Sequence, residues 1–355
     1  MKKLRVGFLS TAGIGKKNWQ AVFHSGNCAV AAVASRDVNK SRKFIEECSR
    51  DAAFETTPEA LGSYEELLAS KAVDAVYIPL PTALRKEWVV RAANAGKHVV
   101  CEKPCAVSAA DLEEMLAACR KNSVQFLDGV MFMHSARLKK VRETLDDGNA
   151  VGQIRRIASQ FSFLGREDFF RANIRADAAL EPAGCLGDLG WYNIRFTLWA
   201  LGWRLPREIS ARMLAQTDAG VPTDFSAELI FDGGVSASLY CSFINFRQQW
   251  AHVSGTKGYL QVPDFVNPFY GDEIGFEVTN IGQDGYKVLP GVNRIAVPEH
   301  GNGHPTAQES NLFRNFAAQI LSGKLNDDWP MWSLKTQKVL DACLESARKN
   351  CALKL

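Results

Sequence analysis

The stretch that decides the fold is Lys97-His98-Val99-Val100-Cys101-Glu102-Lys103-Pro104-Cys105. Its apolar run, Val99 to Cys101, is typical of a short buried strand, and the strand ends in charged residues. In an open parallel α/β sheet, ligands bind just beyond the carboxyl ends of the strands, so Lys103 is predicted to face a bound molecule. The alternative is a solvated pair of Glu102 and Lys103 in an ordinary connection.

Strands and helices alternate on both sides of this stretch. Strands are predicted over residues 4–10, 29–34, 72–80, 99–101 and 124–127, and helices from residue 16 and over 38–50, 64–69, 86–95 and 108–120. Alternation with short connections indicates a right-handed, doubly wound parallel sheet of the Rossmann type. The strand ends at Ser10, Ser35, Pro79 and Glu102 are therefore expected along one edge of one sheet.

The turn after the first strand is a candidate phosphate-binding loop. It reads Ser10-Thr11-Ala12-Gly13-Ile14-Gly15 and leads into a helix. Amides at a helix start, together with the helix dipole, hold the pyrophosphate in dinucleotide-binding folds. Only Gly15 fits the G-x-G-x-x-G/A fingerprint, although small residues still let the backbone approach a phosphate and the Ser10 and Thr11 hydroxyls add donors. An ordinary βα turn is the alternative.

The end of the second strand favours NADP over NAD. Folds that take NAD usually place Asp or Glu here to bind the ribose 2′-hydroxyl, whereas this chain has Ser35-Arg36. A hydroxyl and a guanidinium suit a 2′-phosphate, because Arg offers a planar, bidentate contact where a carboxylate would repel. Lys40 is a secondary candidate for the same phosphate. Because Asp37 is acidic, NAD remains an alternative cofactor. The alternative for Arg36 is a surface residue that binds no cofactor.

The pattern changes beyond Asp128. Strands are predicted over 154–163, 225–231, 235–243, 250–254 and 259–262, and helices over 137–145, 196–201, 307–321 and 334–349. Asp232-Gly233-Gly234 is a strong hairpin signal, so this sheet is expected to be open and mostly antiparallel. The sequence therefore predicts an α/β protein with a nucleotide-binding domain over 1–127 and a substrate and dimerisation domain over 128–355, whose last helix can pack back on the first domain.

A second motif lies between these parts, in Gly184-Cys-Leu-Gly-Asp188-Leu-Gly-Trp-Tyr192. Asp188 and Tyr192 are four residues apart, which places both on one face of a helix. Small residues before them allow the backbone to come close to a ligand. The alternative has Asp188 as a helix N-cap and Tyr192 as a packing residue. Phe169, Phe170, Arg175 and Trp191 are candidates for a pocket lining or for the core.

The composition narrows the class of protein. The 355 residues are 46% hydrophobic, and 42 basic against 39 acidic side chains leave no basic block, so nucleic acid is not an expected partner. Nine cysteines without a C-x-x-C pair argue against disulfides and a zinc site and for a reducing compartment, the cytoplasm. No stretch approaches the roughly 18 apolar residues of a membrane helix, and no signal peptide is expected.

The motifs resemble the Gfo/Idh/MocA family of oxidoreductases. The likeness is carried by residues 96–104 and 184–192, with support from Ser35-Arg36-Asp37 and from 255–258. It implies a Rossmann domain, a C-terminal domain whose open sheet often mediates dimerisation, and nicotinamide-dependent chemistry on sugars, inositols or related polyols. A tyrosine at position 192 resembles the glucose-fructose oxidoreductase and dihydrodiol dehydrogenase branches, which use NADP.

The chain departs from the family pattern at three places. Gly184-Cys-Leu-Gly187 stands in for a more glycine-rich run. Asp128-Gly-Val-Met-Phe-Met133-His134 stands where Glu-x-Phe-Met-x-Arg is frequent, so a basic substrate contact is not expected there. Arg85 stands where a His is common. These departures concern the substrate more than the fold.

The resemblance assigns the roles in the site. Lys103 is the family's E-K-P lysine, Tyr192 the general acid/base for hydride transfer on a sugar, polyol or cyclic diol, and Asp188 the residue that orients the substrate. The predicted cofactor contacts are Ser10, Thr11, Ala12, Gly13, Ile14, Ser35, Arg36, Pro79, Leu80, Pro81, Glu102 and Lys103. No metal is expected, and the partner is a second copy, in a dimer or a tetramer. The rival hypothesis is an inactive nucleotide-binding sensor of the same fold.

Overall fold

The computed structural model describes residues 2–269, 271–284 and 287–355. The chain divides into two compact units: unit 1 holds residues 1–135 and 300–334, and unit 2 holds residues 136–299 and 335–355. The expected domain boundary followed residue 127, whereas the first division lies after Ser135 and a late segment returns to unit 1.

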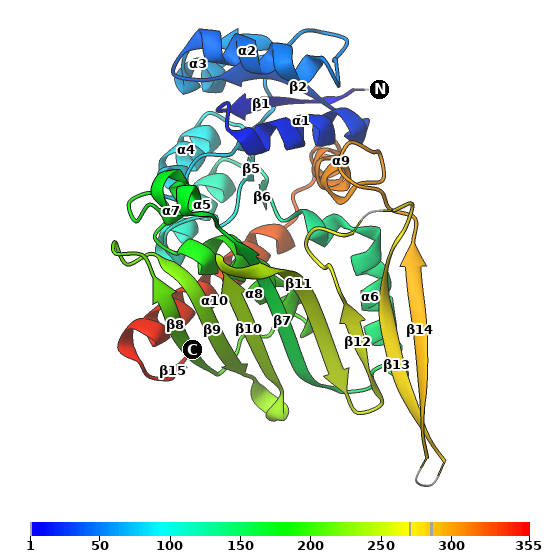
Figure 1. Cartoon of the computed structure of the whole chain (residues 1–355). Coiled ribbons are helices and arrows are strands. Elements are labelled where there is room, and N and C mark those ends of the chain that lie inside the picture. Colours follow the sequence, from blue (N-terminus) through cyan, green and yellow to red (C-terminus); the bar gives the residue numbers. More distant parts are fainter. Residues whose placement is uncertain (1, 270, 285–286) are drawn as a thin grey trace. The chain divides into compact units, whose positions relative to one another are not determined.

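The described residues of unit 1 form a six-stranded parallel sheet in the order β3-β2-β1-β4-β5-β6 (Figure 1). The strands are β1 (Leu4–Leu9), β2 (Cys28–Ala34), β3 (Glu59–Leu61), β4 (Ala75–Ile78), β5 (His98–Cys101) and β6 (Phe126–Asp128). This order, with its reversal between β1 and β4, confirms the predicted doubly wound fold and places the ligand crevice at the carboxyl ends of these strands. The sequence analysis missed β3 because it has only three residues and no apolar run.

Helices alternate with these strands, and short polar side chains begin several of them. The helices are α1 (Gly13–Ser25), α2 (Val38–Ser49), α3 (Tyr64–Ala69), α4 (Thr82–Asn94), α5 (Ala109–Lys121) and the 3₁₀ turn η1 (Met131–His134). Ser63 and Ser108 accept hydrogen bonds from the amides three residues ahead, which satisfies donors that a helix leaves unpaired at its start. The cap at Ser108 confirms the sequence prediction.

The returning segment completes unit 1. Its helix α9 (Gln308–Leu321) packs on α1. Arg314 of α9 donates to the carbonyls of His24 and Ser25 at 3.0 Å each, and these bonds fix α9 at the end of α1. The penultimate helix therefore belongs to the nucleotide-binding unit. The last helix, α10 (Asp328–Lys349), crosses the division at residue 334 and lies mostly in unit 2.

The described residues of unit 2 form a nine-stranded sheet in the order β14-β13-β12-β11-β7-β10-β9-β8-β15. The strands are β7 (Ile154–Leu164), β8 (Glu208–Gln216), β9 (Pro222–Ile230), β10 (Ser236–Ser242), β11 (Ile244–Gly255), β12 (Gly258–Val262), β13 (Ile274–Asp284), β14 (Lys287–Val297) and β15 (Leu353–Lys354). The β9–β10 and β11–β12 hairpins are antiparallel, as the sequence predicted, while β7 and β10 run parallel.

The helices α6 (Ala136–Asp146) and α8 (Trp191–Ala200) pack on this sheet (Figure 1). Along β9 and β10, buried side chains alternate with half-exposed ones. The unit also holds the short helix α7 (Glu167–Ala172) and the turns η2 (Ile174–Ala176), η3 (Leu186–Gly190) and η4 (Asp232–Gly234). Every residue of α8 is buried, and α8 contacts β7 and β10 at the middle of the sheet. No described helix is long and apolar enough to cross a membrane.

Candidate functional site

The loop from β1 into α1 is shaped for a phosphate. Ser10 has φ 140°, a backbone conformation that glycine adopts readily and that the fingerprint's first glycine would supply. Its Oγ accepts from the amide of Ala12 at 3.2 Å, which holds the turn closed. No side chain caps the start of α1, and no acidic residue lies in its first turn, so its positive end is open to an anion. A Cβ on Gly15 would lie 3.1 Å from the Phe44 ring. This close packing explains why a glycine occupies the last position of the fingerprint.

The end of β2 fits a 2′-phosphate better than a 2′-hydroxyl. Asp37 accepts from the amide of Asn39 at 2.9 Å and caps α2, so its carboxylate serves the helix. Ser35 is buried at the strand end, and Arg36 is exposed beside it. Burial raises the pKa of Tyr64, and the positive charge of Arg36 opposes this rise. The residues present therefore fit NADP.

The carboxylate of Glu102 is held by a buried network. The Tyr77 hydroxyl donates to Glu102 Oε1 at 2.7 Å, and Asn18 Nδ2 donates to the Tyr77 oxygen at 2.5 Å and to the same Oε1 at 3.3 Å. Burial, followed by the charge of Glu102, raises the pKa of Tyr77 well above its usual value, so Tyr77 stays a protonated donor. A Cβ on Gly129 would lie 3.0 Å from the Glu102 carboxyl group. Residues from three segments, Asn18, Tyr77 and Gly129, thus surround one carboxylate at the tip of β5.

Arg85 ties two of the strand-end loops together. Its Nε donates to the carbonyl of Leu80 at 2.7 Å, and its Nη1 donates to Thr82 Oγ1 at 3.0 Å and to the carbonyl of Pro104. The side chain is 5% exposed. The loop after β4 and the loop that carries Lys103 are therefore joined through a buried guanidinium. The sequence analysis linked Arg85, which stands where a His is common in the family, to the substrate. In unit 1 the Arg85 side chain instead binds the backbone carbonyls of two loops.

In unit 2, Asp188 lies in the π-helical turn η3, which leads directly into α8. A turn of this type inserts an extra residue into the helical repeat and is frequent at functional sites. Neither η3 nor α8 is capped by a side chain, so Asp188 is not the N-cap that the alternative required. Its carboxylate instead pairs with Arg175, whose Nε lies 2.9 Å from Oδ2.

Tyr192 occupies the first turn of α8. It is 6% exposed, and its ring packs edge-on against Phe161 with centroids 5.6 Å apart. Trp191 is fully buried and belongs to the core, and Phe169 packs against Phe163 and Phe243. Of the four candidate lining residues, Arg175 is the one that the structure places against Asp188.

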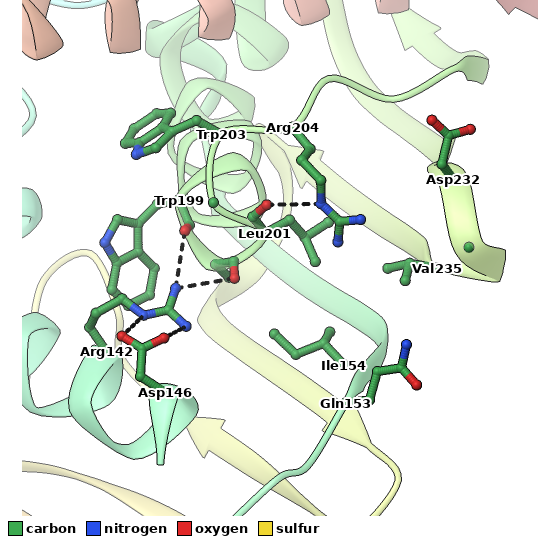
Figure 2. Close-up of a pocket in the computed structure, with 13 residues that line it drawn as sticks. Arg142, Asp146, Gln153, Ile154, Trp199, Leu201, Trp203, Arg204, Asp232 and Val235 are labelled. Atoms are coloured by element: carbon green, nitrogen blue, oxygen red, sulfur yellow. Dashed lines mark hydrogen bonds and ion pairs between the residues drawn. The ribbon is translucent and has the colours of Figure 1, made fainter. Parts of the chain in front are cut away.

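A separate hollow of unit 2 lies at the opposite end of α8 (Figure 2). Its volume is about 570 Å³, and Trp199, Trp203 and Arg204 contribute to its wall. Arg142 pairs with Asp146 at 2.9 Å there and donates to the last carbonyls of the helix. Arg204 donates to the carbonyl of Leu201 at 3.2 Å, and the hollow holds none of the predicted site residues.

The predicted site residues therefore fall into two groups. Lys103 and the cofactor contacts belong to unit 1, while Asp188 and Tyr192 belong to unit 2. Their joint action remains a prediction. The sequence analysis missed Tyr77 and Asn18, which have no motif of their own and reach Glu102 from β4 and α1. Among the described residues, no cluster of His, Cys, Asp or Glu could hold a metal ion.

Comparison with known proteins covers both units. Residues 4–130 match the model of an oxidoreductase family with an NAD-binding Rossmann fold, and residues 138–261 match the GFO/IDH/MocA C-terminal domain. A D-xylose 1-dehydrogenase (NADP(+)) from Haloferax volcanii is 30% identical over 98% of this chain and 99% of its own length. A trans-1,2-dihydrobenzene-1,2-diol dehydrogenase from Mus musculus is 33% identical over 98% and 96%.

The fold is also that of a solved enzyme. A 3-ketoreductase from Actinomadura kijaniata, in complex with NADP and TDP-benzene, superposes with a TM-score of 0.82 and 26% identity over 97% of this chain and 98% of its own. With matches of this length in both units, the chain belongs to the Gfo/Idh/MocA family of oxidoreductases.

Proposed function

We propose that this protein is an NADP-dependent oxidoreductase that transfers a hydride between the cofactor and a CH–OH or carbonyl carbon of a sugar, polyol or cyclic diol. The observation that carries the proposal is the near-full-length similarity to a xylose dehydrogenase and a dihydrodiol dehydrogenase. Those two enzymes are named for different substrates, a sugar and a cyclic diol, but both are dehydrogenases. We extend their shared dehydrogenase chemistry to this chain, but we do not assign it the substrate of either enzyme.

The choice of cofactor is supported by the end of β2. An exposed Arg36 and a buried Ser35 offer a guanidinium and a hydroxyl, and Asp37 is occupied as the cap of α2. The open positive end of α1 suits the pyrophosphate. When bound, the nicotinamide supplies the carbon that accepts or gives the hydride. The ketoreductase of similar fold was solved with NADP.

The residues of this chain would handle the proton and the orientation. In the oxidising direction, Tyr192 as phenolate takes the hydroxyl proton of the substrate while the C–H bond breaks toward the cofactor and the C=O bond forms. The ammonium of Lys103 favours the phenolate and binds the same oxygen. Asp188 accepts from a neighbouring hydroxyl and fixes the ring. In the reducing direction, Tyr192 returns the proton. Structures of the similar ketoreductase were solved with one tyrosine changed to phenylalanine and with one lysine changed to alanine.

A substrate panel tests the function. Purified protein is mixed with NADP or NAD and with aldoses, polyols and cyclic trans-diols, and the formation of reduced cofactor is followed by absorbance. We expect turnover of at least one ring-bearing alcohol with NADP, and slower turnover with NAD. Tight binding of NADPH without turnover of any alcohol, or of the matching ketones in reverse, would favour the inactive sensor.

The assembly and the compartment are part of the proposal. We infer a homo-oligomer, dimer or tetramer, joined through the free face of the nine-stranded sheet, because its half-exposed residues include a shallow hollow lined by Arg212, Glu228, Tyr240 and Trp250. All nine cysteines are free thiols, and eight are buried, which suits a reducing compartment such as the cytoplasm. Sedimentation of the protein and of Tyr240→Arg tests the interface, since the variant is expected to run as a monomer.

A further inference from the structure

Arg175 is the residue of unit 2 that links the second motif to the loop before it. It lies in η2, between α7 and η3, and its Nε is 2.9 Å from Oδ2 of Asp188. The side chain of Asp188 is 14% exposed, and that of Arg175 is 44% exposed. A charge-assisted hydrogen bond of this length orients the carboxylate, because one of its two oxygens is committed to a fixed donor.

The positive charge of Arg175 also acts beyond Asp188. Its pKa is raised, first by the charge of Asp188 and against the effect of burial, with further contributions from Glu181 and Tyr192. The guanidinium is held by Asp188, which lies four residues before Tyr192 in the first turn of α8. Asp188 comes from the turn before Tyr192, and Arg175 and Glu181 come from the segment packed against that turn.

This ion pair is poorly explained as a device for stability. Pairs in which one partner is about half exposed contribute only about 0–1 kcal/mol, because water screens the charges and long side chains lose freedom. Unit 2 also contains a contrasting pair, Arg137 and Asp264, which are 4% and 8% exposed and lie within its core. Arg175 instead places its charge beside the two residues that the proposed mechanism uses.

We propose that Arg175 is a positioning residue of the active site, which holds the Asp188 carboxylate in its substrate-binding orientation and places a positive charge beside Tyr192 that favours the phenolate. This inference rests on the proposed function for its catalytic consequence. The proposed mechanism also assigns the ammonium of Lys103 to this phenol, so loss of Arg175 should lower activity without abolishing it.

Three variants test the inference. Arg175→Met removes the charge and keeps the bulk, Arg175→Lys keeps the charge and loses the planar donor, and Arg171→Met is the matched control, since Arg171 is an exposed residue of α7 that pairs with Glu167. We expect Arg175→Met to lower kcat/KM about 10–100-fold, because small misplacement of a reacting group costs that much. Affinity for NADPH and the urea midpoint should stay unchanged. Arg175→Lys should recover part of the loss, and Arg171→Met should behave as the wild type.

Two pH measurements separate this role from a purely structural one. The acid limb of kcat/KM for alcohol oxidation should move to higher pH in Arg175→Met and much less in Arg175→Lys, because loss of a nearby cation disfavours the phenolate. The second measurement needs no turnover: ultraviolet titration of the phenolate, with Tyr192→Phe as the blank, should show a higher pKa for Tyr192 in Arg175→Met than in the wild type.

The outcomes distinguish this inference from the proposed function. A higher pKa of Tyr192 in Arg175→Met than in the wild type supports the inference even if the wild type turns over no substrate. Absence of turnover in the wild type would overturn only the proposed function. An unchanged titration, together with wild-type kinetics in Arg175→Met, would overturn the inference. A drop in activity that is accompanied by a lower urea midpoint and no shift on the pH axis would also overturn it, since such a result is structural damage.

Discussion

The carboxylate of Asp37 accepts a hydrogen bond from the backbone amide of Asn39 at 2.9 Å and so caps α2. An acidic side chain in this region usually signals NAD, because it binds the ribose 2′-hydroxyl. Here the acid is already engaged by a helix terminus, while Arg36 beside it is exposed. The relationship between Asp37 and Asn39 therefore separates two interpretations that the sequence left open.

Arg36→Gln is expected to weaken NADPH binding about 10–100-fold, since a charge-assisted bond to a phosphate contributes about 1.5–3 kcal/mol. Binding of NADH, which lacks the 2′-phosphate, should be unchanged. Fluorescence titration of both cofactors measures the ratio. Asp37→Ala is the control: it should cost about 1 kcal/mol of stability through the lost cap and leave NADPH affinity intact. Equal losses for the two cofactors in Arg36→Gln would contradict the assignment.

Tyr77→Phe is expected to reduce turnover through Glu102, which loses a donor at 2.7 Å. Burial and the charge of Glu102 raise the pKa of Tyr77 well above its usual value. The phenol therefore stays protonated at every pH up to about 9. The ratio of wild-type to variant rates should therefore be the same at every pH from about 6 to about 9. A ratio that changes across this range would mean that Tyr77 itself titrates during catalysis.

Gly184→Ala is expected to destabilise unit 2 strongly. Gly184 has φ +47°, and a Cβ there would lie 2.2 Å from the carbonyl oxygen of Pro222. Gly220→Ala is the matched control, because Gly220 has φ +81° and no heavy atom within 4 Å of the added Cβ. The control should lose about 1–2 kcal/mol from backbone strain alone. Gly184→Ala should lose about 1–3 kcal/mol more from the clash. Urea unfolding measures both, and equal losses would show that the backbone relaxes.

Five of the six described strands of unit 1, all except β3, were predictable because each is a short apolar run bounded by Gly, Pro or Ser. Their alternation with helices leaves one sheet topology. The strands that the sequence analysis did not predict lack a regular apolar pattern. β8 lies next to the short edge strand β15, and its exposed Leu214 interrupts the alternation of apolar and polar residues. β13 and β14 carry glycines and a proline, residues that usually mark turns.

The candidate site was predictable in its motifs and unpredictable in its support. Glu102, Lys103, Asp188 and Tyr192 stand in local patterns that the sequence displays. The residues that bind Glu102 and Asp188 belong to no such local pattern. Tyr77 reaches Glu102 from β4, and Arg175 reaches Asp188 across a loop. The residue spacing gives no sign of the π-helical turn that carries Asp188, so the sequence left open whether Asp188 caps the helix.

The pairing of Lys103 with Tyr192 is the central claim, and a double-mutant cycle on kcat/KM tests it most directly. Lys103→Ala and Tyr192→Phe should each lower the rate by about 10² or more, with NADPH affinity nearly intact. Because both groups act on one substrate oxygen, the double variant should lose little more than the slower single variant. Losses that multiply in the double variant, or single variants that turn over like the wild type, would contradict the account.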